Sequence, residues 1–235
     1  MTRVLLVRHG RTSANASGVL AGRSPGVHLD DIGIAQASAV GELLQDVPVT
    51  HIVTSPLPRT VETAKLIRAR LQSAQPLRIA KDKGLLECDY GDWSGRTLKK
   101  LARDPLWGAV QAHPSSVTFP GGESMLASQT RAVGAVRKWS ALAEVQCAQR
   151  AVVLIVSHGD IIKSVVADAL GMHLDAFQRI VIDPGSVTAI DYTALRPFVR
   201  LVNGTGDVSV DLQAGIPTSS DAALGGGAGS KKRRK

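Results

Sequence analysis

The stretch "VLLVRHGRTSAN", residues 4–15, decides the fold. Its apolar run from Val4 to Val7 is typical of a buried strand. The run passes without a break into Arg8, His9 and Gly10. In open α/β sheets, ligands bind outside the carboxyl ends of the strands, and glycine lets a ligand approach the backbone there. The stretch therefore predicts a strand that delivers two polar side chains to a binding site.

A second strand ends in the same way. "VLIVSHG", residues 153–159, is an apolar run followed by a polar residue, His158 and Gly159. Asp160 then opens a predicted helix, whose N-terminal amides favour an anion nearby. A single histidine at a strand end is more often structural. Two of them, at two strand ends of one sheet, indicate a shared pocket.

The rest of the chain alternates strand-like and helix-like segments. The predicted strands are 3–7, 51–55, 151–156, 179–183, 186–191 and 198–202, and the predicted helices are 32–44, 61–71, 123–143 and 161–170. The run "AVVLIV" at 151–156 is apolar throughout, as suits the middle of a sheet that is covered on both faces. This alternation predicts an α/β fold, a three-layer α/β/α sandwich with a mostly parallel central sheet.

Composition predicts one domain over residues 1–205 and a flexible tail over 206–235. The chain has 235 residues, 44% hydrophobic and 20% charged, which is ordinary for a soluble protein. After about residue 203 it becomes rich in Gly, Ser, Ala and Thr, and it ends in "GGGAGSKKRRK". Such a segment has too little apolar surface to offset the entropy of ordering, so we expect roughly 212–235 to be disordered.

Charge and hydropathy indicate which classes of binding partner the protein has. Five of the eight units of net positive charge lie on the last five residues, and aromatic residues are only 3%. Both facts make nucleic acid unlikely as the main partner, since base-stacking platforms need aromatic side chains. No stretch approaches the roughly 20 apolar residues of a membrane span. We expect a cytoplasmic protein with a small-molecule partner and no membrane partner, and the sequence leaves a homodimer open.

Two further segments carry polar residues beside predicted helices and turns. In "SPLPRTVETA", residues 55–64, Arg59 lies at a helix start, where the helix dipole disfavours a cation unless the cation faces a bound anion. In "LLECDYGDWSG", residues 85–95, Glu87 precedes a Tyr-Gly turn. Standing alone, each would be a surface residue. With the two strand ends, they complete a set of two arginines, two histidines and one glutamate.

This set suits phosphoryl transfer. Guanidinium groups form bidentate hydrogen bonds with phosphate oxygens. A neutral imidazole can attack phosphorus and carry the phosphoryl group. A carboxylic acid can protonate the leaving oxygen and later take a proton from water. No metal or other cofactor is required if the cations neutralise the developing charge.

The chain resembles the histidine phosphatase superfamily, in the branch that includes the cofactor-dependent phosphoglycerate mutases. The resemblance rests on "RHG", "SPLPRTVETA", "LLECDYGDWSG", "FPGGES" at 119–124 and "VSHG", in the expected order. It implies His9 as the phosphorylated nucleophile and Glu87 as the proton donor, with Asp89 as the second choice. It also implies phosphoryl contacts from Arg8, Arg59 and His158, and substrate contacts from Asn15, Gly22, Tyr90 and Gly159.

The sequence departs from the family pattern at two positions. Many members have an acidic residue after "RHG" and a glutamate in the W-x-G segment, where this chain has Arg11 and Ser94. Arg11 either adds positive charge at the pocket mouth or is a solvated loop residue. Trp93, Trp107 and Trp139 are expected to be core or interface aromatics.

Four functions remain open at this point. The first is a metal-independent phosphomonoesterase that acts on small phosphorylated metabolites through a phosphohistidine. The second is a phosphoglycerate mutase-like phosphomutase. However, the related mutases carry a long basic, proline-rich insertion after the general-acid segment, and here residues 96–120 contain no proline run. The third is a metal-dependent hydrolase with His9 and His158 as ligands, and the fourth is a non-catalytic phosphate-binding protein.

Overall fold

The computed structural model describes residues 1–73, 77–147 and 151–205. The predicted tail, 206–235, lies outside the described residues. The strands are β1 (Thr2–Arg8), β2 (His51–Thr54), β3 (Ile79–Lys81), β4 (Ala151–Ser157), β5 (Val187–Tyr192) and β6 (Pro197–Gly204). The helices are α1 (Ser13–Ala16), α2 (Asp31–Leu43), α3 (Pro58–Arg68), α4 (Leu98–Leu101), α5 (Trp107–Ala112), α6 (Met125–Cys147) and α7 (Gly159–Ala169).

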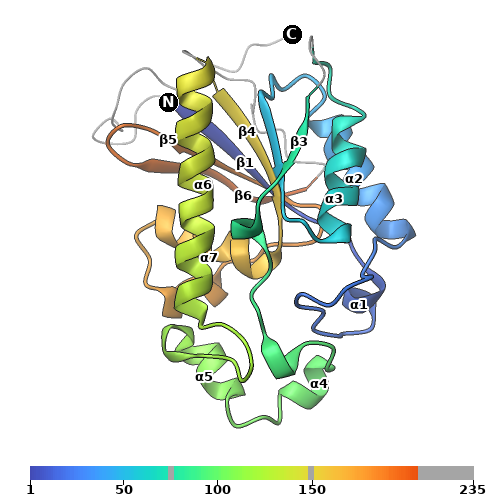
Figure 1. The fold of residues 1–235 in the computed structure, drawn as a ribbon, viewed down its shortest axis with the longest axis vertical. Helices are drawn as coiled ribbons and strands as arrows, with labels where there is room; N and C mark the ends of the chain where they lie inside the picture. The colour runs from blue at the N-terminus through green and yellow to red at the C-terminus, as the bar shows by residue number, and fades with distance from the viewer. Residues whose placement is uncertain (74–76, 148–150, 206–235) are drawn as a thin grey trace.

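One six-stranded sheet forms the middle layer, in the order β3-β2-β4-β1-β5-β6. The pairings among β3, β2, β4 and β1 are parallel, and those of β5 with β1 and β6 are antiparallel. The predicted α/β sandwich with a mostly parallel sheet is therefore confirmed. Figure 1 shows α1, α4 and α5 gathered beyond the carboxyl ends of β1 and β4.

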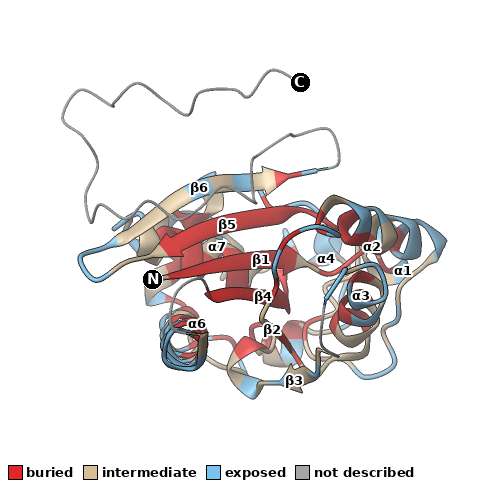
Figure 2. Ribbon diagram, turned by 90° about the horizontal axis from the view of Figure 1, so that it is seen from above, coloured by how far each residue is buried: buried red, intermediate tan, exposed pale blue. Residues whose placement is uncertain are grey.

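Successive side chains of β1 point to opposite faces of the sheet and belong to two separate parts of the hydrophobic core. Val4 and Leu6 pack in a hydrophobic cluster with residues of α6 and α7, whereas Leu5 and Val7 pack in a second cluster with residues of α2 and α3. Successive strand side chains point to opposite faces, so a strand that is apolar at every position suits a sheet covered on both sides. Figure 2 shows β1 and β4 buried along their length, as the "AVVLIV" run predicts.

The strand predicted at 179–183 is wrong. A 3₁₀ helix, Leu174–Arg179, occupies this region, and the chain then crosses the strand ends as a loop. Ile180 and Ile182 are buried and Val181 is exposed, which gives the alternation of a strand. However, the carbonyl of Ile182 accepts a hydrogen bond from Arg8, and Pro184 has no N–H to donate. The three-residue strand β3 has no counterpart among the predicted strands, and α3 ends at Arg68, before Leu71.

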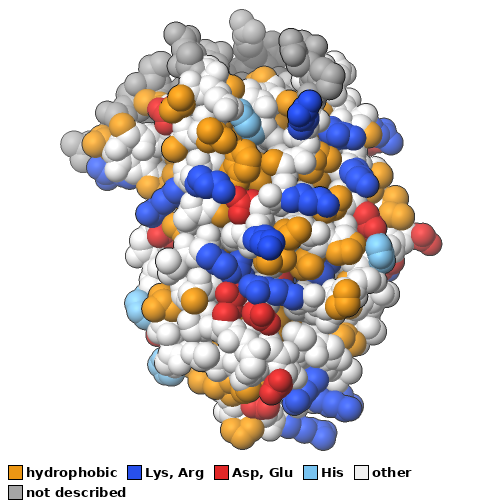
Figure 3. Space-filling view, viewed as in Figure 1, with side chains coloured by type: hydrophobic (Ala, Val, Ile, Leu, Met, Phe, Trp, Pro, Cys, Tyr) orange, Lys and Arg blue, Asp and Glu red, His pale blue; other side chains and the backbone are white. Residues whose placement is uncertain are grey.

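No helix in the described residues is long and apolar enough to cross a membrane. On the face shown in Figure 3, Lys and Arg side chains are spread over the upper and middle parts and gather again at the lower right, with acidic and hydrophobic side chains between them.

The turn after β1 depends on a close approach of two backbones. A Cβ atom on Gly10 would lie 2.3 Å from the carbonyl oxygen of Gly33 in α2, so only glycine fits. We expect Gly10→Ala to lower the free energy of unfolding by about 1–3 kcal/mol, because the backbone must shift to relieve the clash. The measurement is urea denaturation followed by circular dichroism.

The matched control for this prediction is Gly134→Ala. Gly134 is exposed in α6, and nothing lies within 4 Å of the added Cβ. This change should stabilise the protein by about 0.5–1 kcal/mol, since alanine favours the helix. Equal unfolding midpoints for Gly10→Ala and the wild type would contradict the packing described here.

Candidate active site

The register of β1 against β4 brings the two histidines together. Arg8 pairs with Ser157, so His9 and His158 follow at adjacent positions, and the His9 amide donates to the Ser157 carbonyl at 3.0 Å. The ring centroids lie 5.3 Å apart. Both residues are buried, with 4% and 0% of their surface exposed. The two strand ends therefore place the imidazoles side by side, but only His9 lines the cavity, whereas His158 lies behind it and the neighbouring Gly159 lines it instead.

The contacts of His9 define its neutral tautomer. Its Nδ1 lies 2.7 Å from the Gly10 carbonyl oxygen, which can only accept, so Nδ1 carries the proton. Its Nε2 accepts from Nε of Arg59 at 3.2 Å and therefore presents a lone pair. Burial, together with the charge of Arg59, holds the pKa of His9 well below its usual range. The imidazole is thus neutral, with Nε2 available as a nucleophile.

In His158 the ring nitrogen that accepts from Arg59 is Nδ1, whereas in His9 it is Nε2. Its Nε2 lies 2.8 Å from Oγ of Ser55, and its Nδ1 accepts from Nη2 of Arg59 at 3.3 Å. Burial, and then the charge of Arg59, keeps its pKa well below the usual value. Arg59 therefore contacts both imidazoles and orients both of them.

Two arginines have unpartnered buried nitrogens. Arg59, only 2% exposed, donates from Nη2 to the Gly22 carbonyl at 2.7 Å, but its Nη1 has no partner among the described residues. Arg8 donates from Nη1 to the Ile182 carbonyl at 2.6 Å, and its Nε has no partner within the same ranges. A Cβ on Gly159 would lie 3.4 Å from the guanidinium carbon of Arg8. Buried donors without partners are costly, and an anion would satisfy both of them.

Glu87 is placed by hydrogen bonds to its backbone. Arg23 and Arg131 donate to its carbonyl oxygen at 2.8 and 2.9 Å, and the amide of Cys88 donates to its Oε1 at 3.0 Å. Burial, and then the nearby carboxylate of Asp160, raises the pKa of Glu87 to about 7, against the opposing charge of Arg59. Glu87 can therefore both give and take a proton near neutral pH.

Asp89, the second choice for the acid, is placed differently. Its Oδ2 pairs with Arg23 at 3.1 Å, and its Oδ1 accepts from the amide of Gly91 at 3.2 Å. It does not line the cavity that contains His9 and Glu87. The geometry therefore favours Glu87 over Asp89 as the proton donor.

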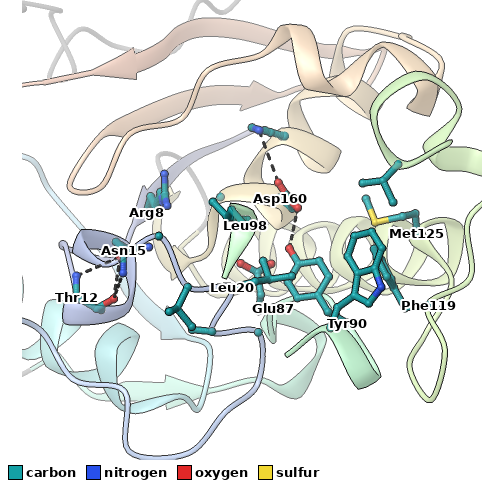
Figure 4. Close-up of a pocket in the computed structure, with 18 of the residues that line it drawn as sticks. Arg8, Thr12, Asn15, Leu20, Glu87, Tyr90, Leu98, Phe119, Met125 and Asp160 are labelled. Carbon is teal, nitrogen blue, oxygen red and sulfur yellow. Dashed lines mark hydrogen bonds and ion pairs between the residues drawn. The ribbon is translucent and has the colours of Figure 1, made fainter. Parts of the chain in front are cut away.

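The predicted substrate contacts line the same cavity, which has a volume of about 470 Å³ (Figure 4). Asn15 uses its side-chain oxygen to accept from the amide and hydroxyl of Thr12, which leaves its NH₂ group as the donor for a ligand. Gly22 has φ +51°, and a Cβ there would lie 2.7 Å from Oγ of Ser94. Tyr90 donates from its hydroxyl to Asp160 at 2.7 Å.

Several of the cavity-lining residues were not assigned to the site from the sequence. Asp160 and Lys163 face the cavity from α7. Both lie in the first two turns of the helix that follows His158, and this closeness to His158 is the sequence signal that could have identified them. Trp93 is a core residue, as expected, but it and Trp107 also line the cavity. Arg11 pairs with Asp30 at 2.9 Å and does not line the cavity.

Metal ligands are not clustered in the described part of the chain. Among residues 1–73, 77–147 and 151–205, no group of three or more His, Cys, Asp or Glu side chains could hold a metal ion. His9 and His158 are instead surrounded by cations.

Comparison with models of protein families identifies the family of this chain. Residues 4–205 match the model of the histidine phosphatase superfamily, branch 1. The chain belongs to that superfamily.

Individual relatives extend the comparison. A Proteus mirabilis protein named "Probable phosphoglycerate mutase GpmB" is 31% identical over 89% of this chain and 94% of its own length. The Mycobacterium tuberculosis "Bifunctional protein Rv2228c" is 35% identical over 87% of this chain, but the match spans only 54% of that protein. The chain thus spans about half the length of the first curated relatives that it matches. The alpha-ribazole phosphatase of Shigella flexneri superposes with a TM-score of 0.71 and 29% identity, over 86% of this chain and 96% of that one.

The raised pKa of Glu87 depends in part on Asp160, which generates a prediction. We expect Asp160→Asn to lower the pKa of Glu87 below about 7, because the substitution removes a negative charge while leaving an acceptor for Tyr90. The measurement is a ¹³C NMR titration of the glutamate side-chain carboxyls, with Glu87→Gln to assign the resonance. The control is Asp168→Asn at the other end of α7, where the Glu87 titration should match that of the wild type. An unchanged Glu87 titration in Asp160→Asn would contradict the proposed coupling.

Proposed function

We propose that this protein hydrolyses small phosphate monoesters through a phosphohistidine at His9, without a metal. The observation that carries the proposal is the pair of buried, unpartnered arginine nitrogens beside a neutral imidazole whose Nε2 lone pair is free of a proton. The alpha-ribazole phosphatase of Shigella flexneri, which shares the fold, supports a phosphatase.

In the first step, Nε2 of His9 attacks phosphorus and the ester P–O bond breaks. The leaving oxygen takes the proton of Glu87, while Arg8 and Arg59 stabilise the charge on the phosphoryl oxygens and His158 holds Arg59 in place. In the second step, a water molecule attacks phosphorus, its proton passes to Glu87, and the N–P bond breaks. Phosphate leaves and both side chains return to their starting states.

The first step requires protonated Glu87, so the rate should fall as the pH rises through the pKa of about 7. We expect an optimum on the acidic side of neutral. Bound phosphate raises the pKa of Glu87 and of His9, since a dianion favours the protonated form of each.

Substitution of the two histidines tests the proposal. We expect His9→Ala to abolish both turnover and covalent labelling, because the phosphoryl group then has no acceptor. His158→Ala should lose about 100- to 1000-fold in kcat, as is typical when one donor to the transition state is lost, because His158 holds Arg59 in place. The measurements are turnover of a ³²P-labelled ester and labelling after an alkaline quench, which preserves phosphohistidine.

His113→Ala serves as the matched control, since His113 is exposed and its nearest carboxylate oxygen, on Asp175, is 3.8 Å away. It should behave as the wild type does. Turnover of His9→Ala at the wild-type rate would overturn the proposed mechanism.

A phosphomutase is the second candidate, and the similarity to the Proteus mirabilis protein supports it. A mutase must protect phospho-His9 from water until a second hydroxyl arrives. We expect hydrolysis instead, with release of phosphate from many small esters and little transfer to 3-phosphoglycerate. The measurement is the lifetime of phospho-His9 with and without that acceptor. A long-lived intermediate that 3-phosphoglycerate discharges quickly would establish the mutase.

A further inference from the structure

The cavity has two chemically different ends. Arg8, His9 and Arg59 line the end where the phosphoryl group would bind. Beyond Glu87 the wall becomes mostly apolar, with Leu20, Leu98, Trp107, Val110, Phe119 and Met125, and two uncharged glutamines, Gln111 and Gln178, also line the cavity. Figure 4 shows Leu20, Leu98, Phe119 and Met125 around the space beside Glu87 and Tyr90. In the proposed reaction, the group that leaves from phosphorus extends past Glu87 into this part of the cavity.

Aromatic side chains support that wall from behind. The ring of Trp93 stacks on Trp107, with centroids 6.1 Å apart and planes at 25°, and meets the edge of Phe119 at 5.3 Å. Tyr90 contacts Phe119 edge to face at 5.1 Å. Trp93, Tyr90 and Phe119 are almost fully buried, so their positions are fixed by packing. The aromatic part of the wall is thus preformed, and the aliphatic side chains of Leu20, Leu98, Val110 and Met125 complete it.

Charges at this end do not favour a second anion. Apart from Arg8 and Arg59, the only cation lining the cavity in the described residues is Lys163. Its Nζ donates to Gln178 at 3.0 Å and lies 3.6 Å from the Asp160 carboxylate. Asp160 also faces the cavity and would repel a carboxylate or a second phosphate.

Two arginines close in sequence to lining residues, Arg11 and Arg23, form ion pairs outside the cavity. Arg23 pairs with Asp89 and Glu123, and Arg11 pairs with Asp30. Neither lines the cavity. An acidic leaving group would therefore enter an apolar space without a free cation, at a high cost in desolvation.

We infer that the substrate is a phosphate monoester whose leaving group is uncharged and carries an aromatic ring, which packs beside Trp107 and Leu98. This inference rests on the proposed phosphomonoesterase activity. The cavity volume of about 470 Å³ lies within the usual range for small-molecule sites and has room for more than the phosphoryl group. An aromatic body gains affinity there because its burial releases water from the apolar wall.

Three primary alkyl esters test the inference with similar leaving oxygens: propyl phosphate, 3-phenylpropyl phosphate and 3-carboxypropyl phosphate. They differ only in the remote group, so leaving-group acidity hardly contributes. We expect kcat/KM for the phenylpropyl ester to exceed that for the propyl ester by about 10- to 100-fold, as apolar pocket contacts typically give. The carboxypropyl ester should be no better than the propyl ester.

Substitutions in and outside the cavity test which residues cause the preference for the phenylpropyl ester. Trp107→Leu should shrink the ratio of phenylpropyl to propyl kcat/KM, whereas Trp139→Leu should keep it. Trp139 lies on α6, bonds Asp82 at 2.8 Å and does not line the cavity. Leu98, which is 44% exposed, allows a second variant that should fold. Leu98→Lys adds a cation to the apolar wall and should raise kcat/KM for the carboxypropyl ester relative to the propyl ester.

The outcomes separate the two proposals. If propyl phosphate labels His9 and is hydrolysed but the phenyl group gives no advantage, or the carboxylate gives one, the inference about the leaving group is wrong and the phosphatase stands. An advantage for the phenyl group that Trp107→Leu and Trp139→Leu retain equally would also overturn the inference. If none of the three esters is hydrolysed and His9 is not labelled, the proposed function fails, and the inference fails with it.

Discussion

The parallel pairing of β1 with β4 is the constraint on which the site depends. It places His9 beside His158, and the hydrogen bond from the His9 amide to the Ser157 carbonyl extends the pairing one residue past the strand. On the other side of β4, the amide of Ser55 donates to the Val156 carbonyl, so β2 ends at the same level. Three adjacent strand ends thus share one edge, and a slip of register by one residue would turn the side chains of the slipped strand to the other face.

Arg59 connects these strand ends electrostatically. A buried guanidinium is costly, and here its partners are a backbone carbonyl and two imidazole nitrogens, with one nitrogen left over. The same charge lowers the pKa of both histidines and opposes the rise in the pKa of Glu87. Arg59 therefore adds to the effect of burial in keeping His9 neutral and moderates the pKa of Glu87, and a bound anion would offset the cost of burying Arg59.

The sequence was sufficient to predict the layers of the fold and the group of residues around His9, because apolar runs that end in polar residues and glycine are local signals. It was insufficient where tertiary contacts decide. The alternation at 179–183 looks like a strand, but the Ile182 carbonyl is taken by Arg8. Asp160 raises the pKa of Glu87 because the fold brings the two side chains near each other, although they are far apart in the sequence. Trp107 lines the cavity because it stacks on Trp93, a contact between segments with no shared pattern.

The apolar wall has one more consequence, which follows from where its residues come from. Leu98, Trp107 and Phe119 belong to a stretch between β3 and β4 that contributes no strand to the sheet in the described residues. Arg8, His9 and His158, at the centre of the proposed site, are fixed by strand pairing instead. Insertions and substitutions in that stretch can remodel the leaving-group end without disturbing the register of the sheet. Evolution can therefore exchange one substrate for another while the reactive centre is inherited unchanged.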